Sequence, residues 1–238
     1  MGCCCSKTPT AEEYLAQAVA TPCADPLLPG MPNAMSCNHW PLKLSSINDN
    51  CGVGEPTTIS VIDSANQQAL ATIEMPPRRS FGIGVTVTDA AGNPFAWLRS
   101  AESQRAQGIN RSSYYVFASR PQIQGQQPSA LDTAGTQGYM WATVTRAPWT
   151  SKVTVTNASG ANVYDGRTVM GFDTSGMQTF LLSSSPDGNG VLHMSKAKTK
   201  PPVHSIRTAQ GGDPLLFLLI KFAAEMTDDE LYQQSGRT

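Results

Sequence analysis

The stretch DPLLFLLIKFAAEM, residues 213–226, limits the fold of this chain more than any other part of its sequence. Asp213 is a suitable N-cap and Pro214 suits a first helical turn, so the stretch predicts an α-helix. Apart from Lys221 the helix is apolar on nearly every face, which is typical of a buried or membrane-spanning helix. The eleven residues from Pro214 to Ala224 are too few for a membrane span, which needs about 20. We therefore expect a buried core helix.

Alternating β-branched residues dominate the chain from residue 57 onward. Three stretches each read as a strand, a polar turn and a second strand: TISVIDSANQQALATI (58–73), GVTVTDAAGNPFAWL (84–98) and KVTVTNASGANVYDG (152–166). Further strands are predicted at 114–119, 138–147, 179–185 and 191–197. The expected fold is mainly β, a closed antiparallel β-barrel of about 12 strands around a central C-terminal hydrophobic helix.

Composition narrows the classes of protein to which the chain can belong. It has 238 residues, of which 40% are hydrophobic and 15% charged, enough to bury a core. The net charge of -1 gives no general attraction to nucleic acid, and no such partner is expected. None of the six cysteines falls after Cys51, which fits a reducing compartment better than a disulfide-stapled secreted fold. The start lacks the apolar region of a secretory signal.

We expect three parts along the chain: a lipidated anchor at 1–10, a short helix and proline-rich segment at 11–56, and the barrel at 57–232. Thr10 and Glu13 form a capping-box pattern that predicts a helix near 11–20. The proline-rich residues 21–56 are either an irregular segment packed on the barrel in places or a disordered linker, and the pattern leaves both open.

The first residues, MGCCCSK, match the N-myristoylation pattern, with Gly2 as the acceptor once Met1 is removed. One myristoyl chain binds a membrane only marginally, and stable anchoring needs a second signal. Cys3, Cys4 and Cys5 are candidate palmitoylation sites that would supply it. A metal-binding thiol cluster and coincidence are the alternatives, and no metal site is expected because zinc-ligand spacing is lacking. The stretch predicts an anchor on the cytosolic face of a membrane.

The hairpins VTVTDAAGNPFAWL and VTVTNASGANVYDG and the closing GGDPLLFLLIKFAAEM resemble the tubby-like superfold. The likeness covers roughly residues 57–232 and is nearest to the branch of phospholipid scramblases and LURP-one-related proteins. The resemblance implies a barrel around the terminal helix and a role at phospholipid membranes. Scramblases carry an acidic calcium-binding stretch before or within the region of that helix, whereas here Asp228, Asp229 and Glu230 follow the predicted helix.

One dense basic stretch, KAKTKPPVHSIR at 196–207, is a candidate contact for lipid headgroups. Lys196, Lys198 and Lys200 would share one face of a strand, and Arg207 follows. Arg78 and Arg79 would add to this surface if the fold brings them near. The alternative is a solvated edge strand on which lysines block edge pairing.

Motifs of catalysis are absent from the sequence. It has no nucleophile elbow, no phosphate-binding glycine loop and no evident triad around His39, His193 and His204. The aspartates are spread over turns, where local hydrogen bonding explains them. We expect no enzymatic activity and no cofactor, with calcium the exception if the chain is a scramblase.

These patterns together predict a lipid-anchored peripheral membrane protein whose tubby-like domain binds anionic phospholipid or tethers a protein partner. The second hypothesis is a phospholipid scramblase that moves lipids between leaflets. The third is a membrane-associated enzyme of unknown chemistry. For a myristoylated and palmitoylated chain the expected location is the cytosolic face of the plasma membrane, with a ciliary membrane also open.

Overall fold

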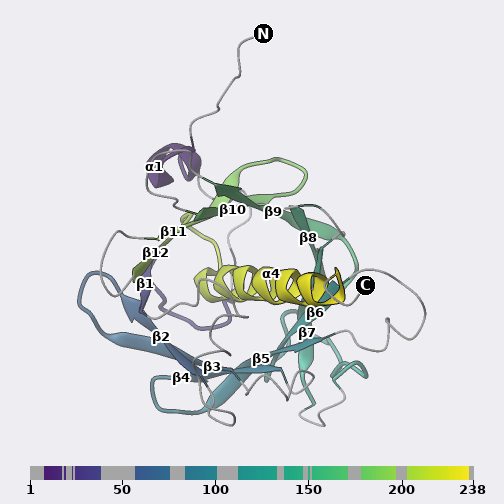
Figure 1. Ribbon diagram of the computed structural model, residues 1–238. Helices are drawn as coiled ribbons and strands as arrows, with labels where there is room; N and C mark the ends of the chain where they lie inside the picture. Colours follow the sequence, from purple (N-terminus) through teal and green to yellow (C-terminus); the bar gives the residue numbers. More distant parts are fainter. Residues whose placement is uncertain are drawn as a thin grey trace.

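The computed structural model describes residues 8–17, 19, 23, 25–38, 57–75, 84–100, 112–132, 137–146, 150, 152–170, 178–196 and 203–235. Within them, twelve strands form a closed barrel in which every neighbouring pair is antiparallel. Consecutive strands are neighbours, and β1 closes the ring by pairing with both β2 and β12. The predicted fold class is confirmed, and Figure 1 shows the ring with α4 inside it.

The strands are short, and most are joined in hairpin order. Their bounds are β1 Ala34–Asn38, β2 Thr57–Asp63, β3 Ala69–Met75, β4 Val85–Asp89, β5 Pro94–Ser100, β6 Ser112–Ala118, β7 Tyr139–Arg146, β8 Lys152–Asn157, β9 Asn162–Met170, β10 Gln178–Ser184, β11 Gly190–Lys196 and β12 Val203–Thr208.

The three look-alike hairpins are β2–β3, β4–β5 and β8–β9, and their turns follow one design. Asp89 accepts hydrogen bonds from the backbone N–H groups of Ala91 and Asn93, and Asn157 bonds Ser159 and Ala161 in the same way. Gly92 and Gly160 supply the positive φ angles of 85° and 83° that these turns require. In the first hairpin, which lacks a glycine, Gln67 takes a φ of 61°. The three hairpins predicted from the sequence are confirmed.

Helix α4, Pro214–Ser235, lies inside the ring. The side chains of Phe217, Leu219 and Phe222 are fully buried, as the all-round apolar pattern predicted. Lys221, the one charged residue between Pro214 and Ala224, is buried too. Its Nζ lies 2.5 Å from Glu225 Oε1 and 4.9 Å from the centroid of the Phe180 ring. The ion pair and the aromatic face replace the water that this ammonium group loses.

Helix α4 is longer than the sequence analysis predicted, because it continues to Ser235 instead of ending at residue 226. The acidic residues Asp228, Asp229 and Glu230 are therefore part of the helix rather than a tail that follows it. Acidic side chains do not end a helix, and the first glycine after the apolar run is Gly236.

Helix α1, Ala11–Tyr14, begins with the predicted capping box: the Thr10 hydroxyl accepts from the Glu13 N–H, and the Glu13 carboxylate accepts from the Thr10 N–H. The helix covers four residues instead of the expected ten. A short helix gains stability mainly from packing, and the chain turns away after Leu15 to follow the barrel. Figure 1 shows α1 outside the ring beside β10 and β11.

The chain between α1 and β1 is tied to the connection between β12 and α4. The N–H of Val19 bonds the carbonyl of Gln210 at 3.1 Å, and the N–H of Cys23 bonds that of Gly211 at 2.7 Å. Leu27 is 2% exposed and belongs to the main core. The described part of the proline-rich segment is therefore packed on the barrel, and it supplies strand β1.

Candidate functional site

A row of directly opposed residues crosses the outer face of five neighbouring strands. Along it, Lys152 of β8 pairs with Arg167 of β9, Arg167 with Leu181 of β10, Leu181 with His193 of β11, and His193 with Arg207 of β12. We call Lys152, Arg167, His193 and Arg207 the basic row. Opposed residues of neighbouring strands share a face and lie about 5 Å apart between Cβ atoms.

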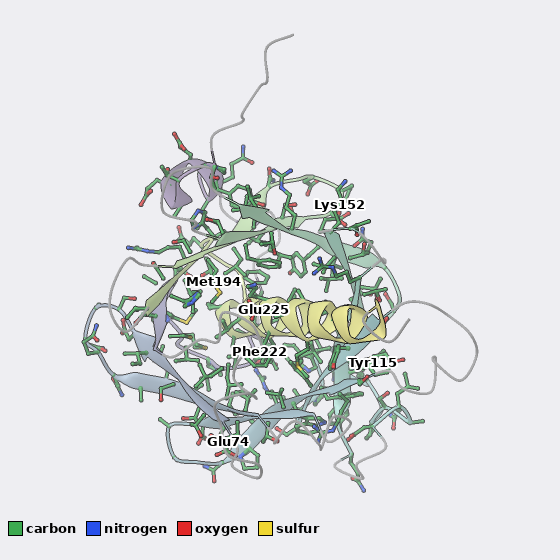
Figure 2. All side chains as sticks on the ribbon, in the orientation of Figure 1. Glu74, Tyr115, Lys152, Met194, Phe222 and Glu225 are labelled. Atoms are coloured by element: carbon green, nitrogen blue, oxygen red, sulfur yellow. The ribbon has the colours of Figure 1, made fainter. Side chains whose placement is uncertain are left out.

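The row faces outward because its neighbours along each strand face the core. Val153, Phe180, Leu192, Met194 and Ile206 all belong to the main core cluster. Side chains alternate between the two faces of a strand, so the row residues point away from α4. Figure 2 shows this difference: Lys152 lies on the outside of β8, whereas Met194 lies within the ring.

The three unambiguous cations of the row are available to an outside ligand. Lys152, Arg167 and Arg207 are all exposed. Ion pairs do form elsewhere, at Arg120 with Asp25 and at Lys221 with Glu225. Among the described residues, by contrast, these three cations have neither an ion pair nor a side-chain hydrogen bond. Their charges are therefore not neutralised within the described part of the protein.

Helix α1 and the residue before its cap cover the middle of the row. Leu181 is 0% exposed and His193 is 7% exposed, although both point outward from the barrel. His193 Nε2 lies 3.2 Å from the carbonyl oxygen of Pro9, and the rings of His193 and Tyr14 lie 6.4 Å apart between centroids. Burial lowers the pKa of His193, an effect partly offset by the contact with Pro9.

A glycine on β11 makes this close approach of α1 possible. A Cβ atom at Gly190 would lie 2.0 Å from the carbonyl oxygen of Tyr14 and 2.7 Å from its ring. Any other residue at this position would therefore push α1 away from the sheet.

The hydroxyl of Tyr14 lies near residues of both β9 and β10. It is within hydrogen-bonding reach of Ser183 on β10 and close enough to Arg167 for electrostatic attraction. Burial nevertheless raises the pKa of Tyr14, so the phenol is neutral near pH 7. Tyr14 thus places a neutral hydroxyl beside a cation of the basic row.

Several site residues predicted from the sequence lie outside the described residues: Gly2, Cys3, Cys4, Cys5, Arg78, Arg79, Lys198 and Lys200. The strand ends that flank Arg78 and Arg79, at Met75 and Val85, lie at the same end of the barrel as Lys196 and Val203, because strand direction alternates around the ring. Lys196 ends β11, with its backbone opposite His204. Arg207 is the predicted cation that the structure places in the basic row.

Lys152, Arg167, His193 and Tyr14 were not predicted as site residues. The pairing of Lys152 with Arg167 could not have been found from the β8–β9 turn alone, because a β-bulge shifts the register between Val155 and Thr156. The position of Arg207 beside His193 could not have been found either, because the connection between β11 and β12 carries no turn signal that defines a register.

Neither a metal-binding cluster nor a bilayer-spanning helix occurs among the described residues. No group of three or more His, Cys, Asp or Glu side chains is arranged there to hold a metal ion. In the same part of the chain, every helix is either too short or too polar to cross a bilayer.

Comparison of the chain with models of known families, with curated proteins and with solved structures gives no match. The architecture itself, a closed antiparallel barrel of twelve strands with a C-terminal helix, is compatible with the tubby-like fold.

Proposed function

We propose that the protein is a myristoylated and palmitoylated peripheral membrane protein whose barrel binds anionic phospholipid at the cytosolic face of the plasma membrane. A tubby-like domain of the scramblase and LURP-one-related branch is part of this proposal. The observation that carries it is the position of the basic row: three exposed cations on either side of the place where residues 9–14 dock.

Chain length connects this row to the predicted anchor. Pro9 contacts His193 in the row, and Cys5 precedes Pro9 by four residues. An extended chain spans at most about 3.5 Å per residue, so the backbone of Cys5 is no more than about 14 Å from Pro9. Acyl groups on Cys3, Cys4 or Cys5 would thus hold this face of the barrel next to the membrane.

Charge and acylation would then reinforce one another. Each lysine or arginine near an anionic bilayer contributes about 1 kcal/mol, and a single myristoyl chain alone binds only marginally. Three cations would therefore add about 3 kcal/mol and orient the barrel. This role requires no catalytic group and no cofactor, so we propose a binding or tethering function and not an enzyme.

The test is binding of the unacylated full chain to vesicles of neutral lipid and of phosphatidylserine-rich lipid, at low and high salt. The triple variant Lys152→Gln, Arg167→Gln, Arg207→Gln is expected to lose the salt-sensitive binding to anionic vesicles. Equal binding of the triple variant and the wild type would reject the proposal. Calcium-dependent movement of labelled lipid between leaflets would instead favour a scramblase.

A control variant distinguishes the effect of the basic row on binding from the effect of the net charge of the chain. Glu74 is exposed on β3, across the ring from Lys152, as Figure 2 shows. Glu74→Lys raises the net charge of the chain by two without touching the row. If the row determines binding, this variant should bind anionic vesicles as the wild type does.

A further inference from the structure

Within the proposed lipid-binding function, on which this inference rests, the basic row is not uniform. We propose that Lys152, Arg167 and the hydroxyl of Tyr14 bind one phosphate monoester, a group with up to two negative charges, between α1 and the β8–β9 hairpin. The source of the monoester is either a lipid headgroup or a small soluble phosphate.

The first argument is the direct opposition of Lys152 and Arg167. Like charges at opposed positions of antiparallel strands destabilise the pair. Here both side chains are exposed and neither has an ion-pair partner among the described residues. A doubly charged phosphate between them would remove the repulsion. The guanidinium group can bind two of its oxygens while the ammonium group acts as a point charge.

The nearest carboxylate along β9 does not neutralise this pair within the described structure. Asp165 lies two residues before Arg167 on the same outer face, opposite Thr154 rather than Lys152. Its Oδ1 lies 3.5 Å from Nδ2 of Asn162, towards the hairpin turn and away from Lys152. The positive charge of the opposed pair therefore remains available.

The third group comes from α1. The Tyr14 hydroxyl lies near Arg167 and Ser183, and a neutral phenol can donate a hydrogen bond to a phosphate oxygen. The site would then join two strands of the barrel to the helix that follows the acylated residues. A bound phosphate would hold α1 in its docked position and so fix the direction in which the anchor leaves the barrel.

Arg207 is the matched comparison within the row. It is separated from Arg167 by β10 and β11, and three steps of about 4.8 Å between strands place the two about 14 Å apart. One phosphate cannot contact both. Arg207 would therefore add to general attraction for anionic lipid without selecting a monoester.

The test uses the unacylated full chain and two kinds of vesicle matched in surface charge, one containing phosphatidic acid, a phosphate monoester, and the other phosphatidylserine. The wild type should prefer phosphatidic acid about tenfold, the effect of one charge-assisted hydrogen bond. Lys152→Gln and Arg167→Gln should abolish the preference, and Tyr14→Phe should reduce it. Arg207→Gln should weaken binding to both vesicles equally and leave the preference intact.

Glycerol 3-phosphate identifies the source of the monoester. If it competes with the vesicles and slows proteolysis of residues 8–17, the site accepts a soluble phosphate. If phosphatidic acid is preferred but glycerol 3-phosphate does not compete, the site binds the phosphate monoester only as part of a lipid headgroup.

Three other results would overturn the inference. Salt-sensitive binding of both anionic vesicles without any preference would reject the monoester site while the proposed lipid-binding function stands. Equal effects of Arg167→Gln and Arg207→Gln on the preference would do the same. Binding of neither vesicle nor of glycerol 3-phosphate would reject both proposals. Thermal unfolding of each variant shows whether a loss reflects misfolding.

Discussion

The carboxylate of Asp213 accepts a hydrogen bond of 2.7 Å from the backbone N–H of Leu27, a residue 186 positions earlier in the chain. Its other oxygen accepts a bond of 3.0 Å from the N–H of Leu216 in the first turn of α4. One side chain thus caps the central helix and holds the N-terminal segment against the end of the barrel where the helix enters. The carboxylate is almost fully buried, and burial raises its pKa.

Replacing this carboxylate should destabilise the whole barrel. Asp213→Ala removes an N-cap and leaves the buried N–H of Leu27 without a partner, so the free energy of unfolding should fall by about 2–4 kcal/mol. Urea denaturation followed by tryptophan fluorescence measures the change. Asp187→Ala, in the exposed turn between β10 and β11, is the matched control and should stay within about 0.5 kcal/mol of the wild type. A similar small effect at Asp213 would contradict the capping role.

Filling the space at Gly190 should displace α1. Gly190→Val would place its side chain against the carbonyl and ring of Tyr14, so residues 8–17 should become more sensitive to protease while the barrel stays folded. Deleting residues 1–17 provides the control, because the steric conflict then disappears. In the truncated chain, the same Gly190→Val substitution should change the melting temperature little. A large change in the melting temperature of the truncated chain would mean that Gly190 is required for strand β11 itself and not for the packing of α1.

Docking of α1 should weaken as the pH falls. Burial lowers the pKa of His193 in the docked state, so below the ordinary histidine range near 6.5 the undocked chain takes up the proton first. Docking is therefore complete above that range and is progressively lost as the pH falls toward the lowered pKa of the docked state. Attraction between Glu12 and the protonated imidazole partly offsets this lowering of the pKa of His193. Arg207 lies opposite His193 on β12. Pro9, Tyr14 and Leu181, the other described residues beside the imidazole, are neutral.

Limited proteolysis of residues 8–17 between pH 7.5 and 5.5 measures this dependence. Cleavage of the wild type should accelerate as the pH falls. His193→Gln keeps a hydrogen-bond donor for the Pro9 carbonyl but does not titrate, so its cleavage should not change with pH over the same range. A pH response of that variant equal to the wild type would assign the effect to another group.

Removing the predicted acylation site should release the protein from membranes in cells. Gly2→Ala should move the chain from the membrane fraction to the soluble fraction, since palmitoylation of the neighbouring cysteines depends on prior membrane contact. Replacing Cys3, Cys4 and Cys5 by serine should leave only weak, reversible attachment through the single acyl chain. Unchanged fractionation of the Gly2 variant would show that MGCCCSK is not the anchor.

Most of the barrel could be predicted from local patterns. The three hairpins centred on Asp63, Asp89 and Asn157 carry their own turn chemistry, and the burial of α4 follows from its apolar surface. Strand β1 could not be predicted in the same way, because AMSCN at 34–38 lies among prolines and its partner β12 is more than 160 residues away in the chain. β1 pairs with β12 only when the ring closes, and a short stretch of sequence cannot show which distant strand will be its partner.

The candidate site was harder to predict than the fold for a related reason. The alternation of Lys196, Lys198 and Lys200 drew attention to one basic stretch, but β11 ends at Lys196. The exposed cations of the described surface come instead from β8, β9 and β12 and meet only through cross-strand register. Docking of α1 on His193 requires a glycine at position 190, because a side chain there would collide with Tyr14. Nothing in the sequence near residue 14 indicates that this helix packs on Gly190.

Pairing of β1 with β12 also has a consequence for the order of events during biosynthesis. The wall of the barrel cannot close until β12, which ends at Thr208, has been synthesised, and the helix that fills it follows β12 in the chain. Structures dominated by such distant contacts form slowly. If Gly2 and the neighbouring cysteines are acylated during synthesis, the amino end is already attached to a lipid surface while the rest of the chain is still open. The bilayer would then be the place where this protein folds as well as the place where it acts.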